Sequence, residues 1–139
     1  FMLDPEKSSV YRRYLPNGVN YNDDWEDVLL DYLQDNGVTV INNKELLIEK
    51  SYTEQVFNRK YDAGHWNDLG RFYGTNNLWA TAKKDFPNVS EYTLDEFDVS
   101  TKVGKYLSNS AFPVNERTPK LELKCDYVDI SDVYNAPKG

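Results

Sequence analysis

The sequence predicts an α/β fold, with a parallel sheet and flanking helices in residues 1–85 and a less regular part in residues 86–139. Two observations lead to this prediction. An apolar strand, an amphipathic helix and a β-branched strand follow one another within residues 1–41, and a βαβ unit of this kind has parallel strands. Beyond residue 85 the segments become short and mixed. The chain has 139 residues, which fits one domain with a sizeable core, so we interpret residues 86–139 as an extension or insert of that domain.

The first strand is expected at Phe1–Leu3, where it ends at Asp4-Pro5 because proline lacks the amide that a central strand needs. The residues after it, as far as Tyr11, are predicted to form a loop at the carboxyl end of the strand, where sites in open α/β sheets tend to lie. Residues 11–15 are expected to form a helical turn. Because the chain opens on an apolar strand without a signal peptide, we expect it to be a piece of a longer protein.

A helix follows, because apolar residues recur at its 3.6-residue period. Asn22 or Asp23 can cap it, with Glu26 as the reciprocal partner of Asp23, and Asn36-Gly37 ends it. The strand Val38–Ile41 comes next and is predicted to be buried on both faces. The apolar stripe of this helix consists of Trp25, Val28, Leu29, Tyr32 and Leu33.

Three more elements are expected before residue 86: a short helix at Lys44–Lys50, a strand at Gln55–Phe57 and a longer helix at Asp68–Lys84. Phe86-Pro87 ends the last of them. In the final third, alternating residues from Leu121 predict a half-solvated strand, so this part is expected to be an antiparallel appendage or an inserted lobe. One side of the longer helix carries Leu69, Phe72, Tyr73, Trp79, Ala80 and Lys83, and the alternating residues are Leu121, Leu123, Cys125 and Tyr127.

The composition excludes several classes of protein. The net charge of −7 repels phosphate backbones, so we expect no nucleic-acid partner. The single cysteine, Cys125, excludes an internal disulfide and a cysteine-rich metal site. No apolar run approaches the roughly 20 residues of a membrane helix, so we expect no membrane insertion. Aromatic residues make up 14% of the chain, and 11 residues are tyrosines, which suit half-buried surfaces as well as sugar-binding clefts.

One stretch, Tyr61–Gly74, contains the only histidine, His65, three residues after Asp62. Three hypotheses compete for this pair. Asp62 and His65 could be the acid and the base of a Ser-His-Asp triad, or Asp62, His65 and Asp68 could bind a metal. Alternatively, the loop is simply polar and its histidine caps the following helix. The triad requires a turn between the two residues, and Ala63-Gly64 permits one.

Two blocks in this order resemble a known family. Residues 62–70, Asp-Ala-Gly-His-Trp-Asn-Asp-Leu-Gly, are similar to the Asp-His-Trp block of the SGNH hydrolase superfamily, in particular its alginate-acetylation branch and related bacterial cell-surface O-acetyltransferases. Upstream, Leu3–Tyr11 is similar to the Pro-Asp-Lys-x-x-Val-Tyr loop of that branch, and Tyr14-Leu15-Pro16 also fits. Alginate-type members commonly have one residue between the acid and the histidine, whereas this chain has the two residues of the wider superfamily. The resemblance covers residues 1–85.

The resemblance implies a fold, a chemistry and a location. The fold would be an incomplete three-layer, flavodoxin-like sheet of the SGNH type. Asp62 would be the triad acid and His65 the general base, with Trp66 and Gly70 as structural members of the block, and no metal or cofactor is needed. The protein would transfer or hydrolyse acyl esters on a polysaccharide outside the cytoplasm. Trp66, Tyr61 and Tyr73 could form an aromatic wall for the glycan, although packing against the helix is an equal alternative for each.

The family's nucleophile is a serine in a Gly-Asp-Ser context, and none of the eight serines of this chain has that context. In the alginate-type branch the serine block follows the Asp-His block. We therefore expect the serine to lie outside residues 1–139 and the isolated chain to lack esterase activity. The alternative is a non-catalytic carbohydrate-binding or structural cell-surface module, in which His65 is only structural. A buried His65 with both ring nitrogens bonded would contradict catalysis. The oligomeric state is not predicted.

Overall fold

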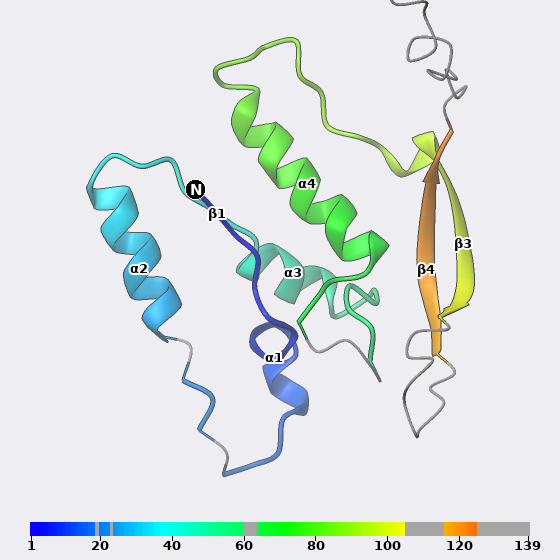
Figure 1. The fold of residues 1–139 in the computed structure, drawn as a ribbon, viewed down its shortest axis with the longest axis horizontal. Helices are drawn as coiled ribbons and strands as arrows, with labels where there is room; N and C mark the ends of the chain where they lie inside the picture. The colour runs from blue at the N-terminus through cyan, green and yellow to red at the C-terminus, as the bar shows by residue number, and fades with distance from the viewer. Residues whose placement is uncertain (19, 23, 60–63, 105–115, 125–139) are drawn as a thin grey trace, which may run out of the picture.

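The structure is a computed structural model, and it describes residues 1–18, 20–22, 24–59, 64–104 and 116–124. All structural statements below concern these residues. Figure 1 shows β1 between the helices α2 and α4, and a β-hairpin on the far side of α4 from α2. The chain is thus a mixed α/β structure with one small parallel and one small antiparallel sheet.

The parallel sheet consists of β1 (Met2–Leu3) and β2 (Ile41–Asn42). Met2 faces Ile41 and Leu3 faces Asn42 in parallel register, which confirms the predicted βαβ unit. The predicted bounds of the second strand are wrong, however, because pairing begins only at Ile41. Val38 directly follows the turn at Gly37 and is 37% exposed, whereas Ile41 is 6% exposed, so the expectation of a strand buried on both faces is also wrong.

The segment after β1 is helical, where the sequence predicts a loop. α1 spans Lys7–Val10, and the 3-10 helix η1 spans Arg12–Tyr14, as expected for the helical turn. The carbonyl of Glu6 accepts from the amides of Ser9 and Val10 at 3.1 and 3.2 Å. A helix of four residues is too short for a periodic pattern, so the sequence gives no sign of α1.

The helix α2 (Asp24–Asp35) is where it is predicted, and the Asn22 side chain accepts from the Asp24 amide at 2.9 Å. The face that it buries is different. Trp25, Val28 and Tyr32 are 61, 68 and 65% exposed, whereas Glu26 and Leu30 are buried. This buried face includes an ion pair, because Lys44 at the start of α3 lies 3.9 Å from the buried Glu26; it also lies 3.4 Å from the exposed Asp27.

The core lies between α1, α3 (Lys44–Lys50) and α4 (Asp68–Ala82). The bounds of α3 and α4 agree with the two predicted helices within two residues. The predicted strand Gln55–Phe57 is wrong: Phe57 forms only an isolated antiparallel bridge with Trp66. No helix in the described ranges is long and apolar enough to cross a membrane. The core cluster consists of Val10, Tyr11, Leu47, Val56 and Phe57, against which Ile48, Trp66 and Tyr73 pack.

The C-terminal part forms the hairpin of β3 (Phe97–Gly104) and β4 (Glu116–Leu123), preceded by the 3-10 helix η2 (Leu94–Glu96). Phe97 pairs with Leu123 and Gly104 with Glu116 in antiparallel register. The strand predicted from Leu121 therefore begins earlier, and its residues 125–127 lie outside the described ranges. Phe72 of α4 and Phe97 of β3 meet edge to face, with ring centroids 5.6 Å apart. The predicted division at residue 85 stays a prediction.

Candidate functional site

The predicted Asp-His pair lies in the connection between Phe57 and α4. Tyr61 and Asp62 fall outside the described residues, so the Asp62–His65 pairing stays a prediction. Gly64 and His65 are described, and both are exposed. A buried histidine would contradict the catalytic hypothesis, and His65 is not buried.

Asn67, two residues after His65, anchors this loop. Its amide donates to the Val56 carbonyl at 3.0 Å, and its side-chain Nδ2 donates to the Gln55 carbonyl at 2.6 Å. Its Oδ1 accepts from the amides of Leu69 and Gly70, each at 3.0 Å, which caps the N-terminus of α4. The residue is 7% exposed. Asn67 therefore fixes the backbone that carries His65 to both the core and the helix.

Asn67→Ala is expected to lower the free energy of unfolding by about 2 kcal/mol, because the helix loses its cap and the part-buried Gln55 carbonyl loses its donor. Urea unfolding monitored by circular dichroism measures this change. Asn17→Ala, at an exposed position, is the matched control and should leave stability nearly unchanged. Equal stability of the two variants would contradict the anchoring role of Asn67.

Trp66 lies against α4. A Cβ atom built on Gly74 would approach the Trp66 ring atoms Cη2 and Cζ3 to 2.6 Å, and one built on Gly70 would approach the Trp66 Cβ to 2.8 Å. The indole thus rests in the space that two glycines, one helical turn apart, leave on α4. These contacts describe packing, and the assignment of Trp66 to a glycan wall stays a prediction.

Tyr73 packs at the edge of the core and is bound to Glu54. Its hydroxyl lies 2.8 and 2.7 Å from the two carboxylate oxygens. Burial, the hydrogen bond and the negative charge of Glu54 raise the pKa of the Tyr73 phenol above its usual range. Lys50 lies 5.1 Å from the centre of the ring. The predicted role of Tyr73 in substrate binding is not tested by these contacts.

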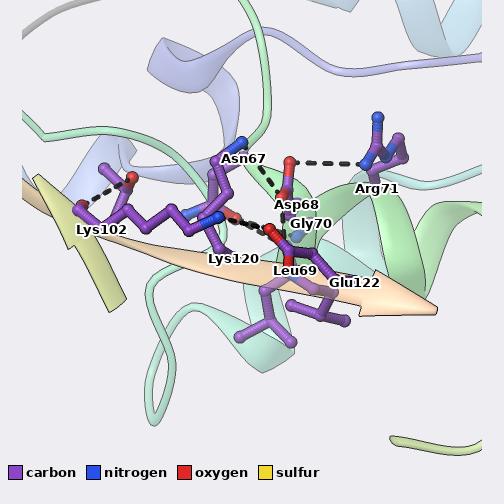
Figure 2. A network of polar contacts seen from close by, with 10 residues as sticks. Asn67, Asp68, Leu69, Gly70, Arg71, Lys102, Lys120 and Glu122 are labelled. Carbon is purple, nitrogen blue, oxygen red and sulfur yellow. Dashed lines mark hydrogen bonds and ion pairs between the residues drawn. The ribbon is translucent and has the colours of Figure 1, made fainter. Parts of the chain in front are cut away.

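Asp68, the third residue of the hypothetical metal site, is engaged elsewhere. Its carboxylate lies 3.2 Å from the Lys120 ammonium and 3.4 Å from the Arg71 guanidinium, and it accepts from the Leu121 amide at 3.3 Å. Figure 2 shows Asp68 with Arg71 on the same helix and with Lys120 of β4, and the ion pair to Lys120 joins the start of α4 to β4. Among the described residues no group of three acidic, histidine or cysteine side chains could hold a metal ion. Asp68 is thus an anchor for the hairpin.

A second part of the candidate site is a cavity of about 600 Å³ beside α1 and η1. The Lys7 ammonium donates to the Arg59 carbonyl at 3.0 Å, which joins α1 to the segment that leads into residues 60–63. The cavity has both of these residues in its wall. It is lined by Glu6, Lys7, Ser8, Tyr11, Tyr14, Leu15 and Arg59.

Sequence reasoning assigned no chemistry to these lining residues. The signal was present, however, because Leu3–Tyr11 and Tyr14-Leu15-Pro16 form the upstream block of the resemblance. Only the fold shows that Arg59, far along the chain, closes the same cavity.

Comparisons with known proteins bear on the fold. No protein-family model matches the sequence, and neither does any curated protein. Among solved structures, Bacillus cereus PatB1 with a sulfonyl adduct is similar, with a TM-score of 0.64, 19% sequence identity and 88% of this chain covered. A second structure of Bacillus cereus PatB1 has the same TM-score and coverage at 17% identity. The chain spans 41 and 44% of those two chains, and at this identity the likeness concerns the fold.

Proposed function

We propose that this chain is part of an SGNH-type serine acyl-ester hydrolase or O-acetyltransferase that acts on a cell-surface or secreted polysaccharide. The observation that carries the proposal is the exposed His65, held by Asn67 at the start of α4 in a block that resembles the superfamily's Asp-His block. The likeness in fold to PatB1, one structure of which carries a sulfonyl adduct, supports it. The fold would be an incomplete three-layer sheet of the SGNH type.

In this mechanism Asp62 orients the His65 ring, and His65 accepts the proton of a serine hydroxyl as the serine oxygen attacks the acyl carbonyl. Backbone amides stabilise the tetrahedral oxyanion. The ester C–O bond then breaks, the leaving alcohol takes the proton from His65, and the serine carries the acyl group. A sugar hydroxyl or water, deprotonated by His65, then attacks the acyl carbonyl; the bond from the serine oxygen to the acyl group breaks, and the serine oxygen takes the proton back from His65. We place this serine outside residues 1–139, since the sequence holds no Gly-Asp-Ser block.

A non-catalytic carbohydrate-binding module is the second candidate. The tyrosine-lined cavity beside α1 favours it, because such a cavity can hold a sugar without any chemistry. The two candidates differ in the role of His65. In the enzyme it is the general base, whereas in the binding module it is only structural.

The test is acetyl-ester hydrolysis by the full-length protein, with an arylsulfonyl fluoride as covalent inhibitor. We expect turnover that the inhibitor abolishes, with the adduct on a serine beyond residue 139 by peptide mass spectrometry. The 139-residue chain alone should be inactive. An inactive full-length protein would favour the binding module, and robust turnover by the 139-residue chain would place the nucleophile inside it.

A further inference from the structure

The cavity beside α1 and η1 combines aromatic, charged and hydroxyl groups in one wall. Its volume of about 600 Å³ lies in the range of small-molecule sites. The rings of Tyr11 and Tyr14 and the side chain of Leu15 supply apolar surface, while Glu6 and Lys7 supply polar groups. Apolar faces with a few converging hydrogen-bonding groups match a pyranose ring, which has apolar C–H faces and a rim of hydroxyls.

The exposed Tyr14 side chain contacts two neighbouring side chains, Arg13 and Tyr11. It is 73% exposed, yet the Arg13 guanidinium lies 4.6 Å from the centre of its ring, and the Tyr11 ring lies 5.9 Å away. Arg13 is itself fixed by the carbonyl of Ser51 at 2.7 Å and by its hydroxyl at 2.9 Å. The ring is therefore held in place before any ligand arrives, which lowers the entropy cost of binding.

Two polar side chains of the cavity, Lys7 and Glu6, have hydrogen-bond partners within the chain. Lys7 uses one of its three ammonium hydrogens on the Arg59 carbonyl at 3.0 Å. Ser8 donates to the Glu6 carboxylate at 3.4 Å, which leaves that carboxylate with further acceptor capacity. Donors and acceptors thus stand together at the rim, as the alternating hydroxyls of a sugar require.

We propose that this cavity is a glycan subsite in which a pyranose unit stacks on Tyr14 and its hydroxyls bind Glu6 and Lys7. The Lys7–Arg59 bond joins two residues of its wall. This role rests on the proposed function for the choice of a polysaccharide, but it needs no catalysis. It adds Tyr14 to the aromatic contacts that the sequence predicts at Tyr61, Trp66 and Tyr73.

The test is a titration of the 139-residue chain with cellotetraose and with tetragalacturonate, followed by NMR. We expect at least one of them to shift resonances of residues 6–15, and Tyr14→Ala to weaken that binding about tenfold. Tyr14→Phe should bind nearly as tightly as the parent, because it keeps the ring. Tyr32→Ala, which alters a tyrosine on α2 that is 65% exposed, is the matched control and should bind unchanged.

Two results would overturn the subsite: no binding of either tetrasaccharide, or an equal loss of affinity in Tyr14→Ala and Tyr32→Ala. Both variants are at exposed positions, and the one-dimensional NMR spectrum checks that each is folded. Because the titration needs no turnover, the outcome is independent of the esterase assay. If the 139-residue chain binds sugar but the full-length protein has no esterase activity, the proposed enzyme is refuted and the subsite is supported. If the full-length protein has esterase activity but the chain binds neither sugar, the enzyme is supported and the subsite is refuted.

Discussion

His65→Gln in the full-length protein is expected to lower kcat for acetyl-ester cleavage by about 10⁴-fold or more, because the serine then has no base. His65 is exposed, so the free energy of unfolding should change by less than about 0.5 kcal/mol. Steady-state kinetics and urea unfolding measure the two quantities separately. Loss of activity without loss of stability is the expected signature of a catalytic group.

Lys84→Gln is the matched control, since Lys84 is exposed and follows the end of α4. It should keep the parent's kcat. The chain holds one histidine, so a single imidazole signal in the NMR spectrum of the 139-residue chain reports on this residue alone. If His65→Gln keeps more than a tenth of the parent's kcat, His65 is not the general base and the triad hypothesis fails.

Gly70→Ala is expected to destabilise the chain by about 3 kcal/mol. Its Cβ would overlap the Val56 carbonyl oxygen and lie 2.8 Å from the Trp66 Cβ. Neither is the end of a flexible side chain. Moving the Val56 carbonyl would also strain its bond with the Asn67 amide, at 3.0 Å. The gain in helix propensity from glycine to alanine is about 1 kcal/mol, which is too small to offset the overlap.

Gly64→Ala is the control for this variant, because a Cβ atom at Gly64 would meet no atom within 4 Å. Chemical unfolding of the two variants, followed by circular dichroism, gives the comparison. If Gly70→Ala and Gly64→Ala are equally stable, α4 does not lie as close to Val56 as the structure has it.

Features set by neighbouring residues could be predicted from the sequence. The start of α4 at Asp68 follows from local capping, and so does the end of α2 at Asp35, two residues before Gly37, whose φ is +79°. The parallel pairing of β1 with β2 follows from the chain between them. The Asp-His block itself was found by its motif, and the pairing of Asp62 with His65 stays a prediction.

Features set by distant residues could not be predicted. The stripe that contains Trp25, Val28 and Tyr32 has the period of a buried face. In the structure the buried Glu26 is instead paired with Lys44 of another helix. A periodic pattern within one helix does not predict an ion pair between helices. The cavity escaped prediction for the same reason, since Arg59 meets Lys7 only in the fold. Tyr14, seven residues after Lys7, is therefore recognisable in the sequence only as part of a motif.

The bond between Asp68 and Leu121 has a consequence for the order of folding. It joins residues 53 apart in the chain, and the bond from Gln55 to Glu116 spans 61 residues. The pairing of β3 with β4, by contrast, is contained within the hairpin. Closing such long loops carries an entropic cost that local contacts must offset first. We expect α4 and the hairpin to form separately and to dock late, with a φ-value near zero at Asp68. The bond from the Leu121 amide to Asp68 then forms only at the last step of folding.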